Sequence, residues 1–279
     1  MECEDFALKE KVKIVVATHK KYQMPEDKMY IPLHVGAAAK LDNDGNPLDF
    51  DYVKDDSGQN ISSLNYRFGT QTGLYWIWKN VDSEYKGLVH YRRHFVGKHP
   101  NKKDIVGSAI TFEELRPLLK KYKVFTPKKR HYYIESLDSH YAHTHDGSHF
   151  RIVRDIIQKD CPEYLHAFDT VMKRTWGYMF NMMIMKNELM DDYCSWLFNI
   201  LFQVAGSIDA NTLSDFDSRF CGRISEILFD VWLEKKVEDS IVKKDEIKEL
   251  PYMEQVNWIF KIKAFLAAKF LKQKYGKSS

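Results

Sequence analysis

Short apolar runs alternate with longer amphipathic segments over most of the chain. VKIVVAT (12–18) and GLVHYRRHF (87–95) are apolar runs that end in polar groups, a pattern typical of buried parallel strands. Apolar residues recur at helical spacing in residues 60–80, 111–122 and 150–168. Strands that alternate with helices in this way predict an α/β domain with a mainly parallel sheet.

The pattern changes in the second half of the chain. YKVFTP (122–127) and TWGYMFNMMIMK (175–186) are predicted strands, whereas residues 191–208 and 217–237 have the wide apolar faces of helices. Roughly the last 80 residues are therefore predicted to be all-helical. Residues 131–149 are rich in histidine and show little periodicity, so we expect a polar, partly exposed loop there.

Composition narrows the class of protein. The chain has 279 residues, of which 44% are hydrophobic, enough for one large domain or for one domain with appended helices. We expect no membrane-spanning helix, since no run of 18 apolar residues occurs, and no signal peptide at the acidic N-terminus. Four cysteines without a CxxC pair are expected to be free thiols of a cytosolic chain. The net charge of +3 does not require a polyanionic ligand, and we predict no nucleic-acid partner.

The strand predicted at 87–95 combines apolar residues with positive charge. Arg92 and Arg93 are side chains that are rarely buried unless they are paired, so the strand should leave the core at Tyr91. An arginine pair at a strand end suits an anionic ligand such as a diphosphate, because guanidinium binds such oxygens through two hydrogen bonds. An arginine pair that bridges to carboxylates at the edge of the core explains the same residues equally well.

Several familiar phosphate and metal motifs are absent, among them GxxxxGKS/T, GxGxxG, HExxH and GxSxG. Paired aspartates that could hold a divalent cation do occur, but in contexts typical of turns or of a helix cap. We therefore predict no metal site at these pairs, which are Asp42/Asp44, Asp49/Asp51 and Asp215/Asp217.

The histidine-rich segment allows two interpretations. Imidazole and carboxylate groups between Asp138 and His149 could bind zinc or iron, although their spacing matches no standard template. The favoured interpretation is a polar loop with one functional histidine, which titrates near neutrality and can act as a general base.

Arg219, Arg223 and Glu226 share one face of a predicted helix. They form either a surface ladder of ion pairs, the slightly favoured interpretation, or one wall of a binding site.

The C-terminal segment WIFKIKAFLAAKFLKQKYGK (258–277) has an apolar stripe flanked by lysines. Such a stripe normally packs on the protein's own core. The excess of lysine with tryptophan and phenylalanine equally suits a helix that lies on an anionic membrane surface.

Five motifs, in order, resemble one family. They are similar to glycosyltransferases of bacterial capsule, exopolysaccharide and O-antigen clusters, which carry a formerly uncharacterised domain and include galactofuranosyltransferases. The resemblance covers roughly residues 11–235. The motifs are IVVATHK (14–20), YIPLHVGAA (30–38), NISSLNYRF (60–68), TGLYWIWKN (72–80) and GLVHYRRHF (87–95).

The resemblance implies a GT-A-like fold, in which a Rossmann-type mixed sheet flanked by helices binds a nucleotide sugar at its strand ends. It implies a transferase domain over residues 1–237, a helical C-terminal part and a basic amphipathic tail at 238–279. The donor-binding residues that it implies are Thr18, His19, Lys20, Asn60, Asn65, Trp76, Lys79, His90 and Tyr91.

The family's expected position for a metal-binding DxD is occupied here by the basic run His90–Arg93. Arginine is therefore expected to neutralise the leaving diphosphate itself, and no cofactor is predicted, with a divalent metal left open. The chain departs from the family at Thr70-Gln71, where an acidic residue followed by leucine is usual.

The predicted function is transfer of a hexose, such as galactofuranose, from a UDP-sugar to a lipid-linked oligosaccharide at the inner face of the cell membrane. Arg92 and Arg93 are the predicted diphosphate ligands, and His145 or Asp146 is the predicted base. The alternative is a non-catalytic, peripheral membrane or polyanion-binding subunit of an assembly complex.

Overall fold

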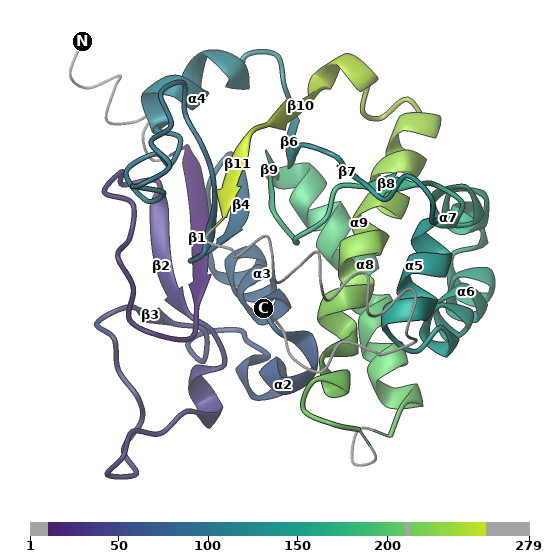
Figure 1. The fold of residues 1–279 in the computed structure, drawn as a ribbon, viewed down its shortest axis with the longest axis horizontal. Helices are drawn as coiled ribbons and strands as arrows, with labels where there is room; N and C mark the ends of the chain where they lie inside the picture. The colour runs from purple at the N-terminus through teal and green to yellow at the C-terminus, as the bar shows by residue number, and fades with distance from the viewer. Residues whose placement is uncertain (1–10, 210–212, 255–279) are drawn as a thin grey trace.

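The structure is a computed structural model that describes residues 11–209 and 213–254. A mixed β-sheet lies beside a layer of helices (Figure 1). The strand order is β10-β6-β9-β4-β1-β2-β3. The strands on this path are β1 (Val12–Thr18), β2 (Tyr30–His34), β3 (Val53–Lys54), β4 (Tyr85–His90), β6 (Val124–Pro127), β9 (Met183–Lys186) and β10 (Ile247–Leu250).

Most strands of this sheet run parallel. Only β9 opposes its two neighbours on the path, β4 and β6. Two short strands, β5 (Arg93–Phe95) and β11 (Tyr252–Glu254), extend the sheet through antiparallel pairing of β5 with β4 and with β11. The predicted α/β class with a mainly parallel sheet is confirmed.

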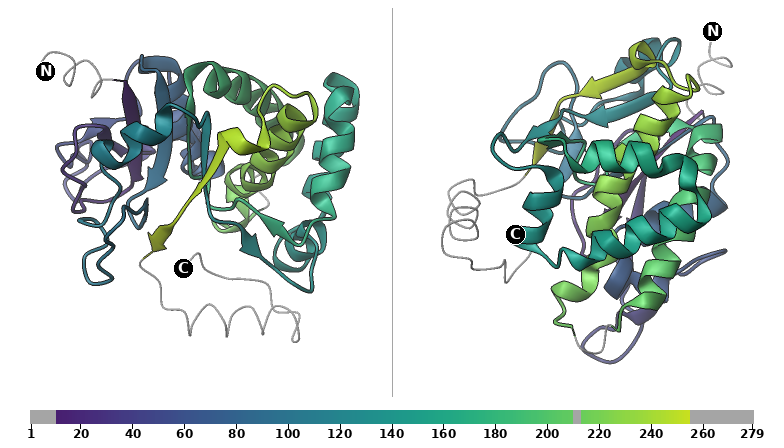
Figure 2. Two further views of the ribbon diagram at one scale, coloured as in Figure 1. Left: turned by 90° about the horizontal axis from the view of Figure 1, so that it is seen from above. Right: turned by 90° about the vertical axis from the view of Figure 1, so that its right-hand side faces the viewer.

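Helices cover the sheet and then stack on one another (Figures 1 and 2). Helices α3 and α8 pack on strands β1, β4 and β9, and α6, α7 and α9 build outward from α8 and from each other. The helices are α2 (Asn65–Phe68), α3 (Gln71–Asn80), α4 (Phe112–Leu119), α5 (Leu137–Thr144), α6 (Ser148–Asp160), α7 (Leu165–Met172), α8 (Asn187–Ser207) and α9 (Phe220–Glu238). Within the described ranges, no helix is long and apolar enough to cross a bilayer.

The helix predicted over residues 60–80 is divided into α2 and α3. Gly69 separates them with a φ of +56°, a left-handed conformation that glycine adopts without steric cost. The side-chain amide of Asn65 donates to the Gly69 carbonyl at 2.7 Å and holds this corner. The apolar spacing continues across the break, which is why the sequence predicts one helix.

The long strand predicted at 175–186 is wrong, because β8 (Trp176–Gly177) belongs to a separate two-stranded sheet, β9 belongs to the main sheet, and residues 178–182 between them are in neither. Phe180 and Asn181 have positive φ angles, 83° and 52°. The Asn181 side chain compensates for the lost strand pairing, since it donates to the Gly222 carbonyl of α9 at 2.8 Å and accepts from the Ser225 hydroxyl. The segment therefore follows α9 instead of extending a strand.

Two further predictions need correction. The loop predicted over residues 131–149 contains helix α5, whose first turn is capped by the Ser136 hydroxyl accepting from the Ser139 N–H at 3.1 Å. The predicted all-helical C-terminal part contains β10 and β11, which pair with β6 and β5. The predicted tail at 238–279 thus supplies strands to the sheet, and its amphipathic segment 258–277 lies outside the described residues.

Candidate functional site

Strands β1, β2 and β4 end at the same edge of the sheet, here called the carboxyl edge. Thr18 pairs with His34 in the register of β1 and β2, and Ala17 pairs with His90 in the register of β1 and β4. The Tyr91 N–H then donates to the Ala17 carbonyl at 3.1 Å. The predicted residues Thr18 to Lys20 and His90 to Arg93 therefore lie together, at the position where open α/β sheets bind ligands.

Tyr91 is the buried centre of this edge. The His19 ring meets its ring edge-on at a centroid distance of 5.2 Å. The Lys20 ammonium and the Arg92 guanidinium lie 5.2 and 5.3 Å from the same ring centroid. These contacts stabilise the two cations on the Tyr91 ring and hold both of them at the carboxyl edge.

His19 is surrounded by positive charge. Its pKa is lowered first by burial and then by Arg219, Arg92, Lys20 and Lys40, in that order. These four side chains are here called the cationic cluster. Sequence reasoning missed Lys40 and left Arg219 open between a surface ladder and a site wall, because the fold brings both to the edge, from a loop and from the start of α9.

His90 is kept neutral at the same edge. Burial, followed by the charges of Arg93 and Arg92, lowers its pKa to about 3. Neighbouring His94 is fully buried, and burial lowers its pKa to about 4. Neutral imidazoles add no charge to the cluster, so its positive potential comes from lysine and arginine.

The two predicted diphosphate ligands differ in their surroundings. Arg93 forms a two-point ion pair with Glu254, with Nε and Nη2 at 2.9 and 2.6 Å from Oε2, and both side chains are largely buried. Arg92 has no carboxylate partner among the described residues. Pairing with a core-edge carboxylate thus applies to Arg93, while Arg92 can serve an anionic ligand. Sequence reasoning did not identify Glu254 as the partner of Arg93, because the segment that contains Glu254 was predicted to be helical.

Glu226 of α9 lies within electrostatic range of Arg93. It is partly buried, and its carboxylate accepts the Phe180 N–H. Burial raises its pKa, while Arg93, Arg130 and Arg223 oppose the rise. No ion pair joins Arg219, Arg223 and Glu226 to one another within the described ranges; Arg223 donates to the Phe216 carbonyl and stacks on that ring at 4.0 Å. This arrangement fits the site-wall interpretation and not the surface ladder.

Four of the predicted donor-binding residues make structural contacts within the protein. Asn60 donates to the Asp56 and Gly58 carbonyls, and the Trp76 indole N–H donates to Ser57. Asn65, besides holding Gly69, packs against Gly36 so closely that a Cβ there would lie 2.7 Å away. Lys79 sits on the Trp78 ring at 3.3 Å, near the end of α3 that leads into the start of β4. Lys79 therefore lies toward the edge opposite the carboxyl edge.

Two residues that sequence reasoning missed also lie at the carboxyl edge. His34, at the end of β2, is 1% exposed, and neither ring nitrogen has a hydrogen-bond partner among the described residues. Asp55 is fully buried and accepts the Gly36 and Ala37 N–H groups at 2.9 and 3.0 Å, which fixes the loop after β2. The sequence signal for His34 is a polar residue directly after an apolar run, whereas Asp55 follows Lys54 in a polar segment and has no such signal.

The predicted bases occupy different environments. The partly buried His145 ring contacts the rings of Tyr141 and Phe216, and Phe216 carries Arg223. Asp146 is exposed and accepts the Ser148 N–H at 2.8 Å near the start of α6. His145 is therefore connected to Arg223 of the arginine-lined wall through the Phe216 ring, whereas Asp146 is exposed near the start of α6.

The possible metal ligands serve other purposes. Glu135 bridges His140 and His143 with oxygen–nitrogen distances of 2.8 and 3.0 Å. Asp42 accepts the Asp44 and Asn46 N–H groups in a turn. In the described part of the chain, no group of three such residues is arranged to hold a metal ion.

Fold and site together define a GT-A-like α/β protein with a cationic site at the carboxyl edge of its sheet. A sequence profile described as a domain of unknown function, DUF4422, matches residues 13–237, and the chain belongs to this family. The solved apo structure of WbbM, a bifunctional glycosyltransferase, is similar at 28% identity with a TM-score of 0.75. The match covers 88% of this chain and 45% of the WbbM chain, so this chain spans less than half of that protein's length. No curated protein matches. The predicted GT-A-like fold is confirmed.

Acid should destabilise the fold partly through His90. Its folded pKa of about 3 lies below the ordinary 6.5, so between these values the unfolded chain binds a proton that the folded chain does not, and stability falls as pH falls. His90→Gln should lose about 2–3 kcal/mol less stability than wild type between about pH 7 and about pH 4.5, because the shift acts over about two pH units at about 1.4 kcal/mol each. Urea unfolding at both pH values measures this, with exposed His131→Gln as control. Equal losses in wild type and His90→Gln would contradict the expectation.

Proposed function

We propose that the chain is a glycosyltransferase that moves a sugar from a UDP-sugar to a lipid-linked oligosaccharide in capsule, exopolysaccharide or O-antigen synthesis. The observation that carries this proposal is the cationic cluster at the carboxyl edge of a GT-A-like sheet. Similarity to a bifunctional glycosyltransferase supports it. UDP-galactofuranose is the first donor to test, because the sequence motifs resemble a family that includes galactofuranosyltransferases.

The diphosphate of the donor would lie against Arg92, Lys20 and Arg219. Preorganised cations stabilise the negative charge that develops on a leaving diphosphate, and they act without reorganisation during the reaction. A divalent ion placed here would meet like charge, so the protein's own cations take over that role in the proposed mechanism. His19, held neutral, can donate a hydrogen bond to a phosphate oxygen.

An inverting transfer also needs a base that takes the proton of the acceptor hydroxyl. Glu226 is the favoured base, because its carboxylate is partly buried next to the strand end that carries Arg93, and burial raises its pKa. The sequence-based candidates are His145, at the arginine-lined wall, and Asp146, which faces solvent near the start of α6.

UDP should bind and stabilise the folded chain through Arg92. A ligand at 100 times its dissociation constant adds about 2.7 kcal/mol to the free energy of unfolding. Arg92→Ala should remove most of the UDP-induced rise in Tm and leave the Tm of the free protein nearly unchanged. Arg93→Ala should instead destabilise the free protein by about 3–5 kcal/mol, since it breaks the largely buried ion pair with Glu254.

Differential scanning fluorimetry with UDP, uridine and ADP measures these effects, and exposed Arg151→Ala is the matched control. A non-catalytic polyanion-binding subunit would respond to UDP and ADP alike. No shift with millimolar UDP in the wild-type protein would refute the donor-site proposal.

Glu226→Gln should separate chemistry from donor binding. Removal of a general base typically lowers turnover by about 10²–10⁴. We expect this loss in sugar transfer with the UDP-induced Tm shift preserved, whereas His145→Gln and Asp146→Asn should keep more activity. If Glu226→Gln transfers sugar at the wild-type rate and His145→Gln does not, His145 is the base.

We further propose that residues 258–277, outside the described ranges, hold the enzyme on anionic lipid. Truncation must follow Glu254 and not Leu250, because β11 pairs with β5 and Glu254 binds Arg93. The truncated protein should stay folded, bind UDP and lose sedimentation with anionic liposomes, since lysines near such a surface contribute roughly 1 kcal/mol each. An insoluble truncated protein, or one that still sediments, would show that the stripe has another role.

A further inference from the structure

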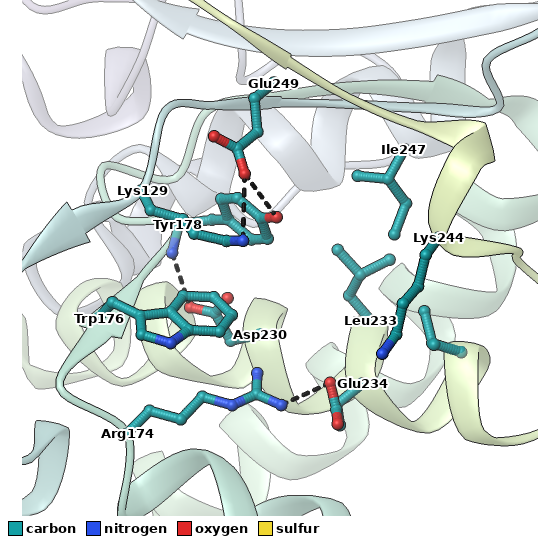
Figure 3. Close-up of a pocket in the computed structure, with 11 residues that line it drawn as sticks. Lys129, Arg174, Trp176, Tyr178, Asp230, Leu233, Glu234, Lys244, Ile247 and Glu249 are labelled. Carbon is teal, nitrogen blue, oxygen red and sulfur yellow. Dashed lines mark hydrogen bonds and ion pairs between the residues drawn. The ribbon is translucent and has the colours of Figure 1, made fainter.

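A cavity of about 300 Å³ lies between α9, β10 and the strand pair β7 (Arg130–His131) and β8 (Figure 3). The proposed transfer of a donor sugar does not use it. Its lining includes Lys129, Arg174, Trp176, Tyr178, Asp230 and Glu249. Its volume falls at the lower end of the range for small-molecule sites.

The cavity adjoins the proposed catalytic centre. Glu226 and Asp230 lie four residues apart on α9, which separates their Cα atoms by about 6 Å along the helix axis. The 176–181 segment contacts both carboxylates, because the Tyr178 N–H donates to Asp230 at 2.9 Å and the Phe180 N–H donates to Glu226. A ligand in the cavity would therefore lie one helical turn from Glu226.

Nearly every charge in the cavity wall has a partner. Lys129 pairs with Glu249 at 3.2 Å and Arg174 pairs with Glu234 at 2.5 Å. Both cations also lie near the Trp176 ring, at 4.4 and 4.6 Å from its centroid (Figure 3). The wall thus offers paired polar groups beside aromatic rings and little net charge, which does not suit a phosphate.

Lys244 has no ion-pair partner within the described ranges, and Asp230 is the acidic exception in this wall. It is 2% exposed, and its Oδ2 accepts the Tyr178 N–H, but Oδ1 has no hydrogen-bond partner within the described ranges. A buried acceptor without a donor costs free energy, so a ligand with hydroxyl donors would stabilise this site. Aromatic rings next to such acceptors are suited to the apolar faces and hydroxyl edges of a sugar.

We propose that this cavity binds a neutral sugar residue of the acceptor glycan, with Asp230 accepting hydrogen bonds from its hydroxyl groups. The assignment of this sugar to the acceptor rests on the proposed transferase function, whereas the binding of a sugar in the cavity does not. Burial also raises the pKa of Asp230 to about 7, so near neutral pH the carboxyl group can donate as well as accept.

The test measures, by saturation-transfer NMR, the binding of a panel of methyl glycosides to the full chain. The panel comprises the methyl glycosides of glucose, galactose, mannose and N-acetylglucosamine. Wild type should bind at least one of them saturably. Asp230→Asn, which keeps an oxygen for the Tyr178 N–H, should weaken that binding at least about tenfold, roughly the value of one hydrogen-bonded contact. Trp176→Ala, at a partly exposed position, should weaken it similarly.

Asp138→Asn is the matched control, because Asp138 lines a separate cavity next to α6 and α7. It should leave glycoside binding unchanged, and all three variants should keep the UDP-induced Tm shift. Glycoside binding without any UDP response would refute the transferase proposal and support the sugar cavity. No saturable binding by wild type, or unchanged affinity in folded Asp230→Asn and Trp176→Ala, would overturn the sugar cavity and leave UDP binding to stand or fall by itself.

Discussion

Concentrated positive charge at the carboxyl edge is the constraint to which the surrounding structure responds. Two like charges 4 Å apart repel by roughly 4 kcal/mol near a protein surface. The chain limits this repulsion by keeping His19 and His90 neutral and by placing cations on the Tyr91 and Phe216 rings. An anionic ligand would relieve what remains, which gives the site a physical reason to bind a diphosphate.

Arg93 shows how far along the chain this compensation reaches. Its partner Glu254 lies 161 residues away and arrives on β11, which pairs with the short strand β5 that carries Arg93. The ion pair is largely buried, so its stability depends on the two-point geometry. One arginine is thereby committed to the fold, and its neighbour Arg92 stays available for a ligand.

Local pattern was sufficient to predict β1, α4, α8 and α9 from the sequence, because apolar period and caps decide such elements. The strand predicted at 87–95 is instead β4, which ends at His90, followed by a turn into antiparallel β5. Local pattern was also sufficient to predict that Thr18–Lys20 and His90–Arg93 lie close together, since parallel strands end at one edge of a sheet. Contacts that depend on distant segments carried no local signal. Glu254, Lys40 and Arg219 reach the site only through tertiary structure.

The prediction of one strand over 175–186 failed for a related reason. Its apolar residues fit a strand, but the side chain of Asn181 and the Tyr178 N–H find partners on α9, and these contacts outweigh strand pairing. A polar group whose partner lies elsewhere in the chain decides the conformation there. Periodicity within the segment cannot reveal that partner.

Helix α9 connects the donor side of the molecule with the proposed acceptor side. Arg219 and Arg223 lie at its start, where the helix dipole is also positive, and both favour an anion. Glu226, Asp230 and Glu234 follow at intervals of four residues on one face, and Arg174 pairs with Glu234. The cationic cluster at the start of the helix favours a diphosphate, whereas the paired charges of the cavity wall further along suit a neutral sugar. One helix can thus order two chemically different substrates around a single carboxylate, Glu226.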